Sequence, residues 1–180
     1  MKKILRKKAL EKRNLVPERK REEMSFKICE KVLKSKEYKN AKTIMVYSCI
    51  ASEVDLESVI IDALSKNKTV CFPRCIKETH EMDVVPVLDL STLLDGAYGI
   101  KEPLGNGIEA KEIDLIIVPI VAFTKNKDRL GYGGGYYDRF FVKTNALKMG
   151  VAYSSQEEEN VYPEKTDIPL DMIVTETEVI

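Results

Sequence analysis

The stretch RLGYGGGYYDRF at residues 129–140 brings together residue types that can bind a phosphate group. Four of the nine glycines in the chain lie between Gly131 and Gly135. A glycine inside a helix or strand costs roughly 0.5–1 kcal/mol relative to alanine, so this cluster indicates a backbone that must come close to something. Arg129 offers a rigid positive fork for phosphate, and Asp138 offers the oxygen ligands that Mg²⁺ prefers. The segment therefore predicts an anion-binding loop.

The glycine loop, as we call residues 131–135, matches neither of the common nucleotide-binding motifs. The Walker A pattern GxxxxGK[ST] is absent from the sequence, and the pattern GxGxxG lacks its third glycine after Gly131 and Gly133. Tyr132 and Tyr136 can wall an aromatic substrate. By pattern alone, a glycine-rich turn that leads into a helix is the alternative interpretation.

The sequence around the loop predicts helices that alternate with strands. The expected helices cover residues 2–13, a segment that begins at Pro17, residues 55–67 with Asp55 as N-cap, and the segment after Gly135. The expected strands cover residues 43–49, 70–73, 82–87, 113–123, 149–153 and 171–175. Pro73 is expected to end its strand, Pro86 places the next strand at an edge, and residues 95–107 are expected to form a long loop.

This alternation predicts an α/β fold with a mostly parallel sheet, in a single domain of residues 1–180. The run at 113–123 is continuously apolar, as expected for a central strand that is covered on both faces. Ligands bind outside the carboxyl ends of the strands in such sheets. The glycine loop follows this strand and precedes a helix, so we expect it at that edge, where backbone N–H groups can receive an anion.

The composition is that of a globular protein and argues against several function classes. Of the 180 residues, 44% are hydrophobic and 32% are charged, and 29 Lys and Arg balance 29 Asp and Glu. The net charge of zero gives no indication of nucleic-acid binding, and no apolar run has the length of a membrane span. The N-terminal stretch MKKILRKKALEKR lacks the apolar region of a signal peptide, so we expect a cytoplasmic protein.

Four cysteines and one histidine do not form a recognisable metal site. Cys29, Cys49, Cys71 and Cys75 have the spacing of no common zinc site, and His80 cannot complete one. We therefore expect reduced thiols, with Cys49 and Cys71 as small core residues.

The N-terminal segment is strongly basic, with ten Lys or Arg against three Glu in residues 1–22. Most of these side chains are expected on a solvated helix face. Lys2 and Arg6 are four residues apart and therefore share one face of the expected helix. Both can reach phosphates if this helix lies over the sheet.

With these residues in view, DRLGYGGGYYDRF resembles the signature of the 5-formyltetrahydrofolate cyclo-ligase family. The resemblance covers nearly the whole chain, because further segments follow in the family's order and spacing. They are KKILR at 2–6, SEVDL at 52–56, FPR at 72–74, KEP at 101–103, VPIVAF at 118–123, GVAYSSQ at 150–156 and DIPLDMIVTE at 167–176. Thr124 and Lys127 depart from the family pattern, which usually has Asp and Gly there.

The resemblance implies a single-domain, three-layer α/β/α fold and an ATP-dependent ligase of one-carbon metabolism. Such an enzyme converts 5-formyltetrahydrofolate to 5,10-methenyltetrahydrofolate with ATP and Mg²⁺ and releases ADP and phosphate. It implies small-molecule partners only, with no nucleic acid and no membrane, and a monomer is the favoured state. The formyl oxygen would take the γ-phosphoryl group, and N10 would then attack the activated carbon.

The resemblance also implies a role for particular residues. Arg129 and Lys2 would be catalytic. ATP would contact Lys2, Lys3, Ile4, Leu5, Arg6, Arg129, Leu130, Gly131, Tyr132, Gly133, Gly134, Gly135, Tyr136 and Tyr137. The folate would contact Tyr47, Glu53, Tyr132, Gly133, Gly134, Gly135 and Tyr136, with Glu53 accepting hydrogen bonds from the pterin N–H groups. Asp138 and Asp171 would hold Mg²⁺.

Several of these residues have simpler interpretations. Glu53 can be a solvated loop acid, Tyr47 a core residue and Asp171 a capping carboxylate. Arg74 can serve a phosphate or pair with a surface acid, and Tyr153 can line the substrate pocket. A Cβ atom on Gly134, at the centre of the glycine loop, is expected to meet the ligand or to require a disallowed φ.

Two other functions compete with the ligase. Similar α/β sheets host sugar-phosphate isomerases and CoA-transferase-like enzymes, for which Glu53 could be the catalytic acid or base. A non-enzymatic nucleic-acid binder could use the basic N-terminus, and its binding would fall steeply with salt. For the ligase, ATP and a reduced folate should each raise the melting temperature.

Overall fold

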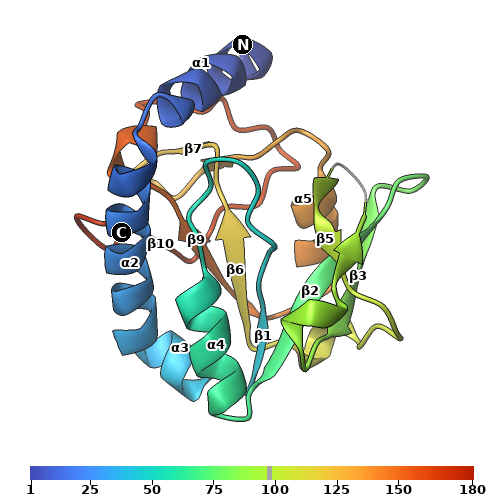
Figure 1. The fold of residues 1–180 in the computed structure, drawn as a ribbon. Coiled ribbons are helices and arrows are strands. Elements are labelled where there is room, and N and C mark those ends of the chain that lie inside the picture. Colours follow the sequence, from blue (N-terminus) through green and yellow to red (C-terminus); the bar gives the residue numbers. More distant parts are fainter. Residues whose placement is uncertain (97–98) are drawn as a thin grey trace.

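The computed structural model describes residues 1–96 and 99–180, and its centre is a six-stranded sheet (Figure 1). In order across the sheet, the strands are β10 (Met172–Val174), β9 (Leu147–Val151), β6 (Leu115–Pro119), β1 (Thr43–Met45), β2 (Thr69–Ile76) and β3 (Glu81–Pro86). Neighbouring strands are parallel except β2 and β3, which are antiparallel. This mixed, mostly parallel and open sheet confirms the predicted fold class, and β3 lies at an edge as Pro86 predicts.

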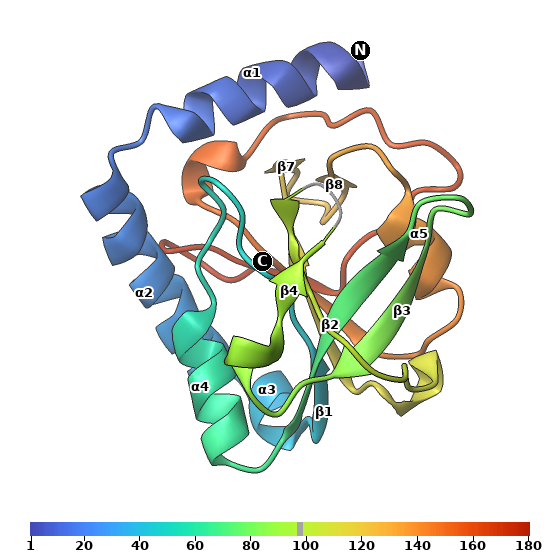
Figure 2. The same cartoon turned by 45° about the vertical axis from the view of Figure 1, so that its right-hand side comes forward.

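Helices cover both faces of the sheet and produce three layers (Figure 2). One face carries α2 (Glu18–Lys34), α3 (Lys36–Asn40) and α4 (Glu57–Ser65), and the other carries α5 (Tyr136–Phe141). Successive residues of a strand point to opposite faces. In β1, Ile44 packs in the core beneath α2 and α4, whereas Met45 packs in the core beneath α5. Because both cores are apolar, the inner strands are continuous hydrophobic runs.

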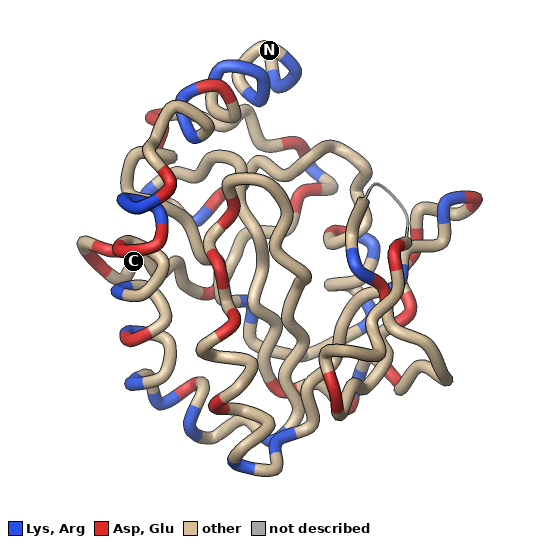
Figure 3. Tube along the Cα trace, in the orientation of Figure 1, with Lys and Arg blue, Asp and Glu red and all other residues tan. Residues whose placement is uncertain are grey.

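The first helix, α1 (Lys2–Asn14), lies across the carboxyl edge of the sheet, as Figures 1 and 2 show. A small hairpin outside the sheet consists of β7 (Ala122–Phe123) and β8 (Arg129–Leu130). Leu5 and Ala9 of α1 pack with Leu130 of this hairpin. The packing brings the Lys and Arg residues of α1, blue in Figure 3, to the edge where the glycine loop is expected.

A bend after β6 makes the second half of the predicted strand 113–123 wrong. β6 ends at Pro119, and the chain then turns into β7, which pairs with β8 instead of continuing in the sheet. The buried Gln156 holds this bend, because its Nε2 donates to the carbonyl groups of Ile120 at 2.6 Å and Val121 at 3.0 Å. Hydropathy does not detect the bend, since the residues on both sides of it are buried.

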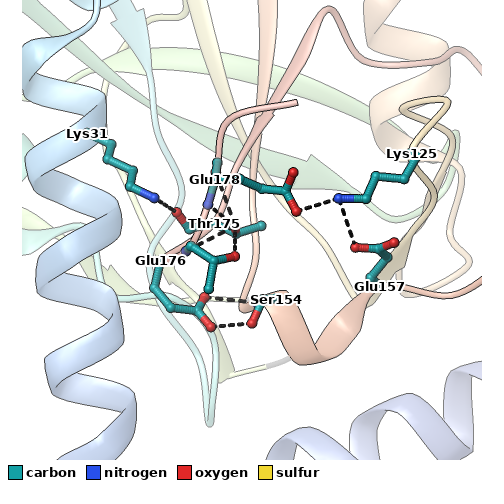
Figure 4. A network of polar contacts seen from close by, with 8 residues as sticks. Lys31, Lys125, Ser154, Glu157, Thr175, Glu176 and Glu178 are labelled. Atoms are coloured by element: carbon teal, nitrogen blue, oxygen red, sulfur yellow. Dashed lines mark hydrogen bonds and ion pairs between the residues drawn. The ribbon is translucent and has the colours of Figure 1, made fainter.

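A polar network fixes the short helix η4 (Ser154–Gln156), which carries Gln156, against the C-terminal segment (Figure 4). Its labelled members are Lys31, Lys125, Ser154, Glu157, Thr175, Glu176 and Glu178. Lys31 Nζ on α2 donates to the Thr175 carbonyl at 2.8 Å, and the Ser154 N–H donates to Glu176 Oε2 at 2.9 Å. The end of the chain therefore supports the bend that delivers the glycine loop to the carboxyl edge.

Two strands differ from their predicted lengths. β1 has only three residues, and Cys49 beyond it is exposed, so its expected place in the core is wrong. Pro73 lies inside β2 instead of ending it. Cys71 O accepts from Val46 N on the β1 side, and Pro73 faces the same side two residues later, where β1 has already ended. Its missing N–H therefore costs no hydrogen bond of the sheet.

Two further boundaries also differ from the predictions. α4 begins at Glu57 and its N-cap is Leu56, so the prediction of Asp55 as N-cap is wrong. Asp55 Oδ1 still accepts a hydrogen bond from the Glu57 N–H at 2.9 Å, just before the helix. The predicted loop at 95–107 contains part of a hairpin, because β4 (Leu94–Asp95) pairs with β5 (Lys101–Glu102). Its residues 97–98 lie outside the described residues. Two further short helices among the described residues are η1 (Leu90–Thr92) and η3 (Ala110–Glu112).

Candidate functional site at the carboxyl edge of the sheet

The glycine loop requires glycine at two positions because of its backbone conformation. Gly133 has a φ of +100° and Gly135 a φ of +70°, in the region that side-chain-bearing residues rarely adopt. The expectation that Gly134 has the special φ is wrong. A Cβ atom on Gly134 would instead lie 2.6 Å from ring atoms of Tyr136, so this glycine makes room for the first side chain of α5. The ring of Tyr136 also lies 5.4 Å from that of His80.

Arg6 of α1 contacts the glycine loop directly. Its Nε donates to the Gly131 carbonyl at 2.7 Å. A Cβ atom on Gly133 would lie 3.0 Å from Arg6 Nη2, so a glycine there lets the guanidinium group lie against the backbone. Since α5 has only six residues, the positive charge of this loop comes mainly from side chains and not from a helix dipole.

The other N-terminal residues are placed differently. Lys2 Nζ forms ion pairs with Asp167 at 2.5 Å and Glu164 at 3.1 Å, both in the segment that leads to β10. Lys3 and Ile4 are exposed. Among the predicted N-terminal residues in the described part of the chain, Arg6 is therefore bonded to the loop, whereas Lys2 is held by two acidic partners.

Arg129 is a buried cation beneath the glycine loop. Its side chain is 7% exposed, and its Nη2 forms an ion pair with Asp138 Oδ1 at 2.7 Å. The guanidinium carbon lies 5.7 Å from the ring centre of Tyr137 and 5.1 Å from that of Phe141. Arg129 Nε is buried and makes no hydrogen bond within the described part of the chain. A Cβ atom on Gly131 would lie 3.3 Å from Arg129 Nη1, so this glycine lets the loop lie close to the charge.

Glu53 is buried, so its interpretation as a solvated loop acid is wrong. It is only 6% exposed. Burial raises the pKa of its carboxyl group, and hydrogen bonds from the Ile50 N–H and the Tyr132 hydroxyl together with the charge of Arg13 oppose that rise. The two bonds measure 3.0 Å to Oε2 and 2.8 Å to Oε1. A carboxylate held in this way is typical of a functional site.

Arg13 also belongs to this candidate site, although it is not among the residues predicted from the sequence. Its Nη2 donates to the Tyr132 hydroxyl at 2.9 Å, and its Nε donates to Ser52 Oγ at 2.9 Å. The signal in the sequence is spacing: Arg13 follows Ala9 by four residues and Arg6 by seven, which places all three on one face of α1. The abundance of arginine and lysine in this helix hides that signal.

The remaining residues have structural contacts. Tyr47 is buried in the core beneath α2 and α4, and its hydroxyl donates to a main-chain carbonyl at 2.6 Å. Tyr153 is also buried, and its hydroxyl donates to the main-chain carbonyl of Glu53 at 3.0 Å. Arg74 pairs with Asp83 at 2.9 Å at the edge of the sheet. These contacts favour the simpler interpretations of Tyr47 and Arg74.

The two predicted metal ligands have different hydrogen-bond partners. Asp138 lies on α5, and its Oδ1 accepts hydrogen bonds from Arg129 and from the Ile168 N–H at 3.1 Å. Asp171 precedes β10 at the amino edge of the sheet, where its Oδ2 accepts from the N–H of Lys148 at 2.7 Å and pairs with its Nζ at 2.9 Å. Within residues 1–96 and 99–180, no group of three acidic, His or Cys side chains could hold a metal.

Two cavities lie near the sheet. One of about 310 Å³ lies between α2 and the segment that carries Glu53, and its lining includes Ser25, Cys49 and Tyr153. The other, of about 430 Å³, lies between β3 and α5 and is lined by none of the predicted site residues. The site is therefore marked by its buried charges and not by the size of a cavity.

None of the helices in the described part of the chain combines the length and the apolar character that a membrane span requires.

Residues 1–176 match the sequence model of the 5-formyltetrahydrofolate cyclo-ligase family. The chain belongs to this family. A probable 5-formyltetrahydrofolate cyclo-ligase of Caenorhabditis elegans is 32% identical over 168 residues, which cover 85% of this chain and 82% of the relative. The 5-formyltetrahydrofolate cyclo-ligase of Haemophilus influenzae is 32% identical over 146 residues, which cover 77% and 78%.

Solved structures of family members have the same fold. The NMR structure of 5,10-methenyltetrahydrofolate synthetase from Aquifex aeolicus matches with a TM-score of 0.88 and 38% identity, over 99% of this chain and 91% of that one. The structure of a 5,10-methenyltetrahydrofolate synthetase from Mycoplasma pneumoniae matches with a TM-score of 0.80 and 29% identity, over 97% and 98%.

The fold also explains one departure from the family pattern. Lys127, where the family usually has glycine, has a φ of +67°. Its N–H donates to the Thr124 carbonyl at 2.9 Å, and the Thr124 N–H donates to the Asp128 carbonyl at 3.0 Å, which closes the turn between β7 and β8. The turn thus keeps a glycine-like conformation, and the lysine adds strain there without opening the loop.

Proposed function

We propose that the chain catalyses the ATP- and Mg²⁺-dependent cyclisation of 5-formyltetrahydrofolate to 5,10-methenyltetrahydrofolate, with release of ADP and phosphate. The formyl oxygen attacks the γ-phosphorus of ATP, and ADP leaves. N10 then attacks the activated carbon, loses its proton, and phosphate leaves as the ring closes. Phosphorylation is required because an amide-like oxygen is otherwise a poor leaving group.

The observation that carries this proposal is the set of contacts made by the glycine loop. The loop lies against the cations Arg6 and Arg129 and reaches the buried Glu53 through Tyr132. Phosphoryl transfer depends mainly on positioning and on neutralising charge. Arg129 supplies a fixed positive charge close to the backbone of the loop at Gly131, and it is assigned the catalytic role together with Lys2.

Glu53 is assigned to the pterin. Its two carboxylate oxygens accept one hydrogen bond each from Tyr132 and the Ile50 N–H. A carboxylate oxygen can accept two, so each keeps one acceptor position for a pterin N–H group. The folate and the phosphates of ATP then meet across the glycine loop, where the formyl oxygen can approach the γ-phosphorus.

Asp138 is the residue that would hold Mg²⁺. Both the Arg129 and the Ile168 hydrogen bonds go to its Oδ1, so Oδ2 can face a metal. Mg²⁺ in such sites keeps several waters and binds through one or two carboxylates together with phosphates, so a single aspartate fits. Bound there, the ion would neutralise charge on the phosphates. The role of Asp171 as a second Mg²⁺ ligand remains a prediction.

The direct test is to incubate the purified protein with 5-formyltetrahydrofolate and Mg-ATP and to follow the absorbance of methenyltetrahydrofolate. We expect product only when ATP, Mg²⁺ and the folate are all present, with one ADP released per product. Melting curves with ATP or the folate alone test each binding step, because each ligand should raise the melting temperature. Absence of product together with absence of both shifts would refute the proposal and reopen the sugar-phosphate and nucleic-acid alternatives.

We further propose that the protein acts as a cytoplasmic monomer whose partners are ATP and 5-formyltetrahydrofolate. The small-molecule site is built from the elements of one chain, so a second copy is not needed to complete it. Light scattering of the purified protein tests the monomer, and a dimer that dissociates without loss of activity would leave the site assignment intact while refuting the assembly.

A further inference from the structure

Arg13 is a permanent charge in a buried position. It is only 2% exposed, and its donors go to neutral oxygens: Ser52 Oγ, the Ile120 carbonyl at 3.4 Å and the Tyr132 hydroxyl. No ion pair to Arg13 is formed within the described part of the chain. A buried charge without a directly bonded counter-charge is costly, so a purely structural arginine here would be a poor choice. Its nearest route to a negative charge runs through Tyr132.

The direction of the hydrogen bonds along that route is fixed by chemistry. Arginine has donors and no acceptor, so the Tyr132 hydroxyl must accept from Arg13. The single proton of this hydroxyl is then left for Glu53 Oε1, which lies 2.8 Å away. Arg13 and Tyr132 therefore stabilise the ionised form of the Glu53 carboxyl group over the protonated form, and they fix its orientation.

We propose that Arg13 is a positioning residue that holds Glu53 in place for the pterin through the hydroxyl group of Tyr132. The assignment rests on the proposed function, because it takes Glu53 as the residue that binds the folate. Arg13 itself touches neither ATP nor folate in this scheme.

Helix α1 also links the relay, as we call the hydrogen-bonded series Arg13, Tyr132 and Glu53, to the phosphate side of the site. Arg6 and Arg13 are seven residues apart, or about two turns of helix, and they hold neighbouring residues of the glycine loop. Arg6 bonds the Gly131 carbonyl and Arg13 bonds the Tyr132 side chain. A shift of α1 would therefore move both the glycine loop and the Glu53 carboxylate.

Arg13 is the charged group whose field favours the ionised form of Glu53. The cavity beside Glu53 is also lined by Glu18, Arg21 and Glu22 of α2 and by Asp55 and Glu57, and further titratable groups face Glu53 from several elements. Loss of hydration at the ionising group raises the pKa of each of the neighbouring phenol and thiol groups, so they stay neutral there, although the residues Cys49 and Tyr132 are exposed overall. They are Tyr47 and Cys49 on the segment after β1, Tyr132 on the glycine loop, Tyr137 on α5, and Tyr153 before η4. Loss of the relay should therefore act on Glu53 mainly by removing one hydrogen bond and one positive charge.

The first measurement needs no ligand. The Glu53 carboxyl carbon is titrated by NMR in the wild type and in Tyr132→Phe and Arg13→Gln, with Glu53→Gln to assign the signal. Because the relay stabilises the ionised form, its loss should raise the pKa of Glu53 by at least about half a unit. Tyr153→Phe is the matched control, since that hydroxyl bonds the Glu53 main chain and not the carboxylate, and it should leave the pKa in place.

The second measurement is calorimetric titration of the same variants with 5-formyltetrahydrofolate and, separately, with Mg-ATP. Arg13→Gln, at a residue that contacts neither ligand in this scheme, should raise the Kd of the folate about tenfold and the Kd of ATP by less than about twofold. Folate binding should also be lost at higher pH than in the wild type, because a raised pKa leaves Glu53 protonated over a wider range. A variant that is merely destabilised would lower the melting temperature without this split.

The outcomes separate the relay from the proposed function. A wild type that binds no folate refutes the function, while the NMR titration still tests the relay. A wild type that binds folate, with a Tyr132→Phe variant unchanged in both the pKa of Glu53 and the folate Kd, refutes the relay. If Arg13→Gln fails to fold, Tyr132→Phe decides alone, because the Tyr132 side chain is partly exposed and its ring is kept.

Discussion

At the amino edge of the sheet, exposed aspartates join neighbouring strands. At the opposite edge, where the strands end, Glu53 is buried among side chains. Asp114 precedes β6 and accepts two main-chain hydrogen bonds from the start of β1, at 2.7 and 2.9 Å. Asp171 precedes β10 and accepts one from Lys148 on β9 at 2.7 Å. Both are exposed. Glu53, at the other edge, is buried and bonded to Tyr132 and to the Ile50 N–H.

The difference indicates which edge is structural and which is functional. An exposed carboxylate that caps a strand stays hydrated, so it stabilises the sheet at little cost. Buried Glu53, Arg13 and Arg129 must all lose hydration, and the alignment of the strands needs none of them. Buried charges that the fold does not require are typical of sites where chemistry is done.

The largest expected effect comes from Arg129 at the carboxyl edge. If it neutralises charge during phosphoryl transfer, Arg129→Ala should lower kcat at least about a hundredfold, or about 2.7 kcal/mol. The side chain is buried against Tyr137 and Phe141, so the melting temperature should fall too. Arg129→Lys is the matched variant: it keeps the charge and should recover stability more than rate, because it lacks the planar fork. A kcat within about twofold of wild type in folded Arg129→Ala would refute the role.

The second effect concerns Glu53. An amide at this position presents an N–H group to the N–H groups of the pterin, so Glu53→Gln should raise the KM of the folate by about thirtyfold. The KM of ATP should change by less than about threefold. Steady-state kinetics with each substrate varied in turn measure both values. Equal changes in the two KM values would place Glu53 in the structural class of Asp114.

The order of helices and strands could be predicted because it depends on local sequence patterns of apolar residues, glycines and prolines. Strand residues such as Ile44 and Met45 are apolar because helices cover both faces, and the four clustered glycines mark a loop that approaches other groups closely. Pro86 predicts an edge strand for the same local reason, a missing N–H. These signals need no knowledge of distant contacts, and the structure confirms them.

The buried polar residues could not be predicted because their partners are far away in the chain. Gln156 holds a bend at Ile120 and Val121, and Arg13 bonds residues 39 to 119 positions away. In the sequence, Arg13 is one basic residue among ten in the first 22. Lys127 adopts a left-handed backbone conformation, which a lysine in a sequence does not normally indicate.

A smaller effect tests the glycines. Gly133 has a φ of +100° and lies against Arg6, whereas a Cβ atom on Gly150 in β9 would meet Ile120 and Leu170 of the core at 2.4 Å. Gly133→Ala should therefore raise the Kd of Mg-ATP about tenfold in the folded protein, with a modest loss of melting temperature. Gly150→Ala should lower the melting temperature more and leave the ATP affinity of the folded fraction unchanged. Normal ATP binding by Gly133→Ala would mean that the glycine loop is not a phosphate cradle.

The smallest effect compares the two aspartates of the amino edge. If Asp171 only joins β9 and β10, as Asp114 joins β1 and β6, then Asp171→Ala and Asp114→Ala should each lower the melting temperature by roughly 2–4 °C. Neither should change kcat or the Mg²⁺ concentration needed for half-maximal rate. If Asp171 is a metal ligand, as the family resemblance implies, Asp171→Ala alone should raise that Mg²⁺ concentration, and Asp138→Asn should raise it as well. A Mg²⁺ titration of the rate in these three variants decides between the two, because the loss of a metal ligand, unlike the loss of a strand cap, should change the Mg²⁺ dependence. The contacts of Asp171 with Lys148 lead us to expect the first result, with the metal dependence following Asp138.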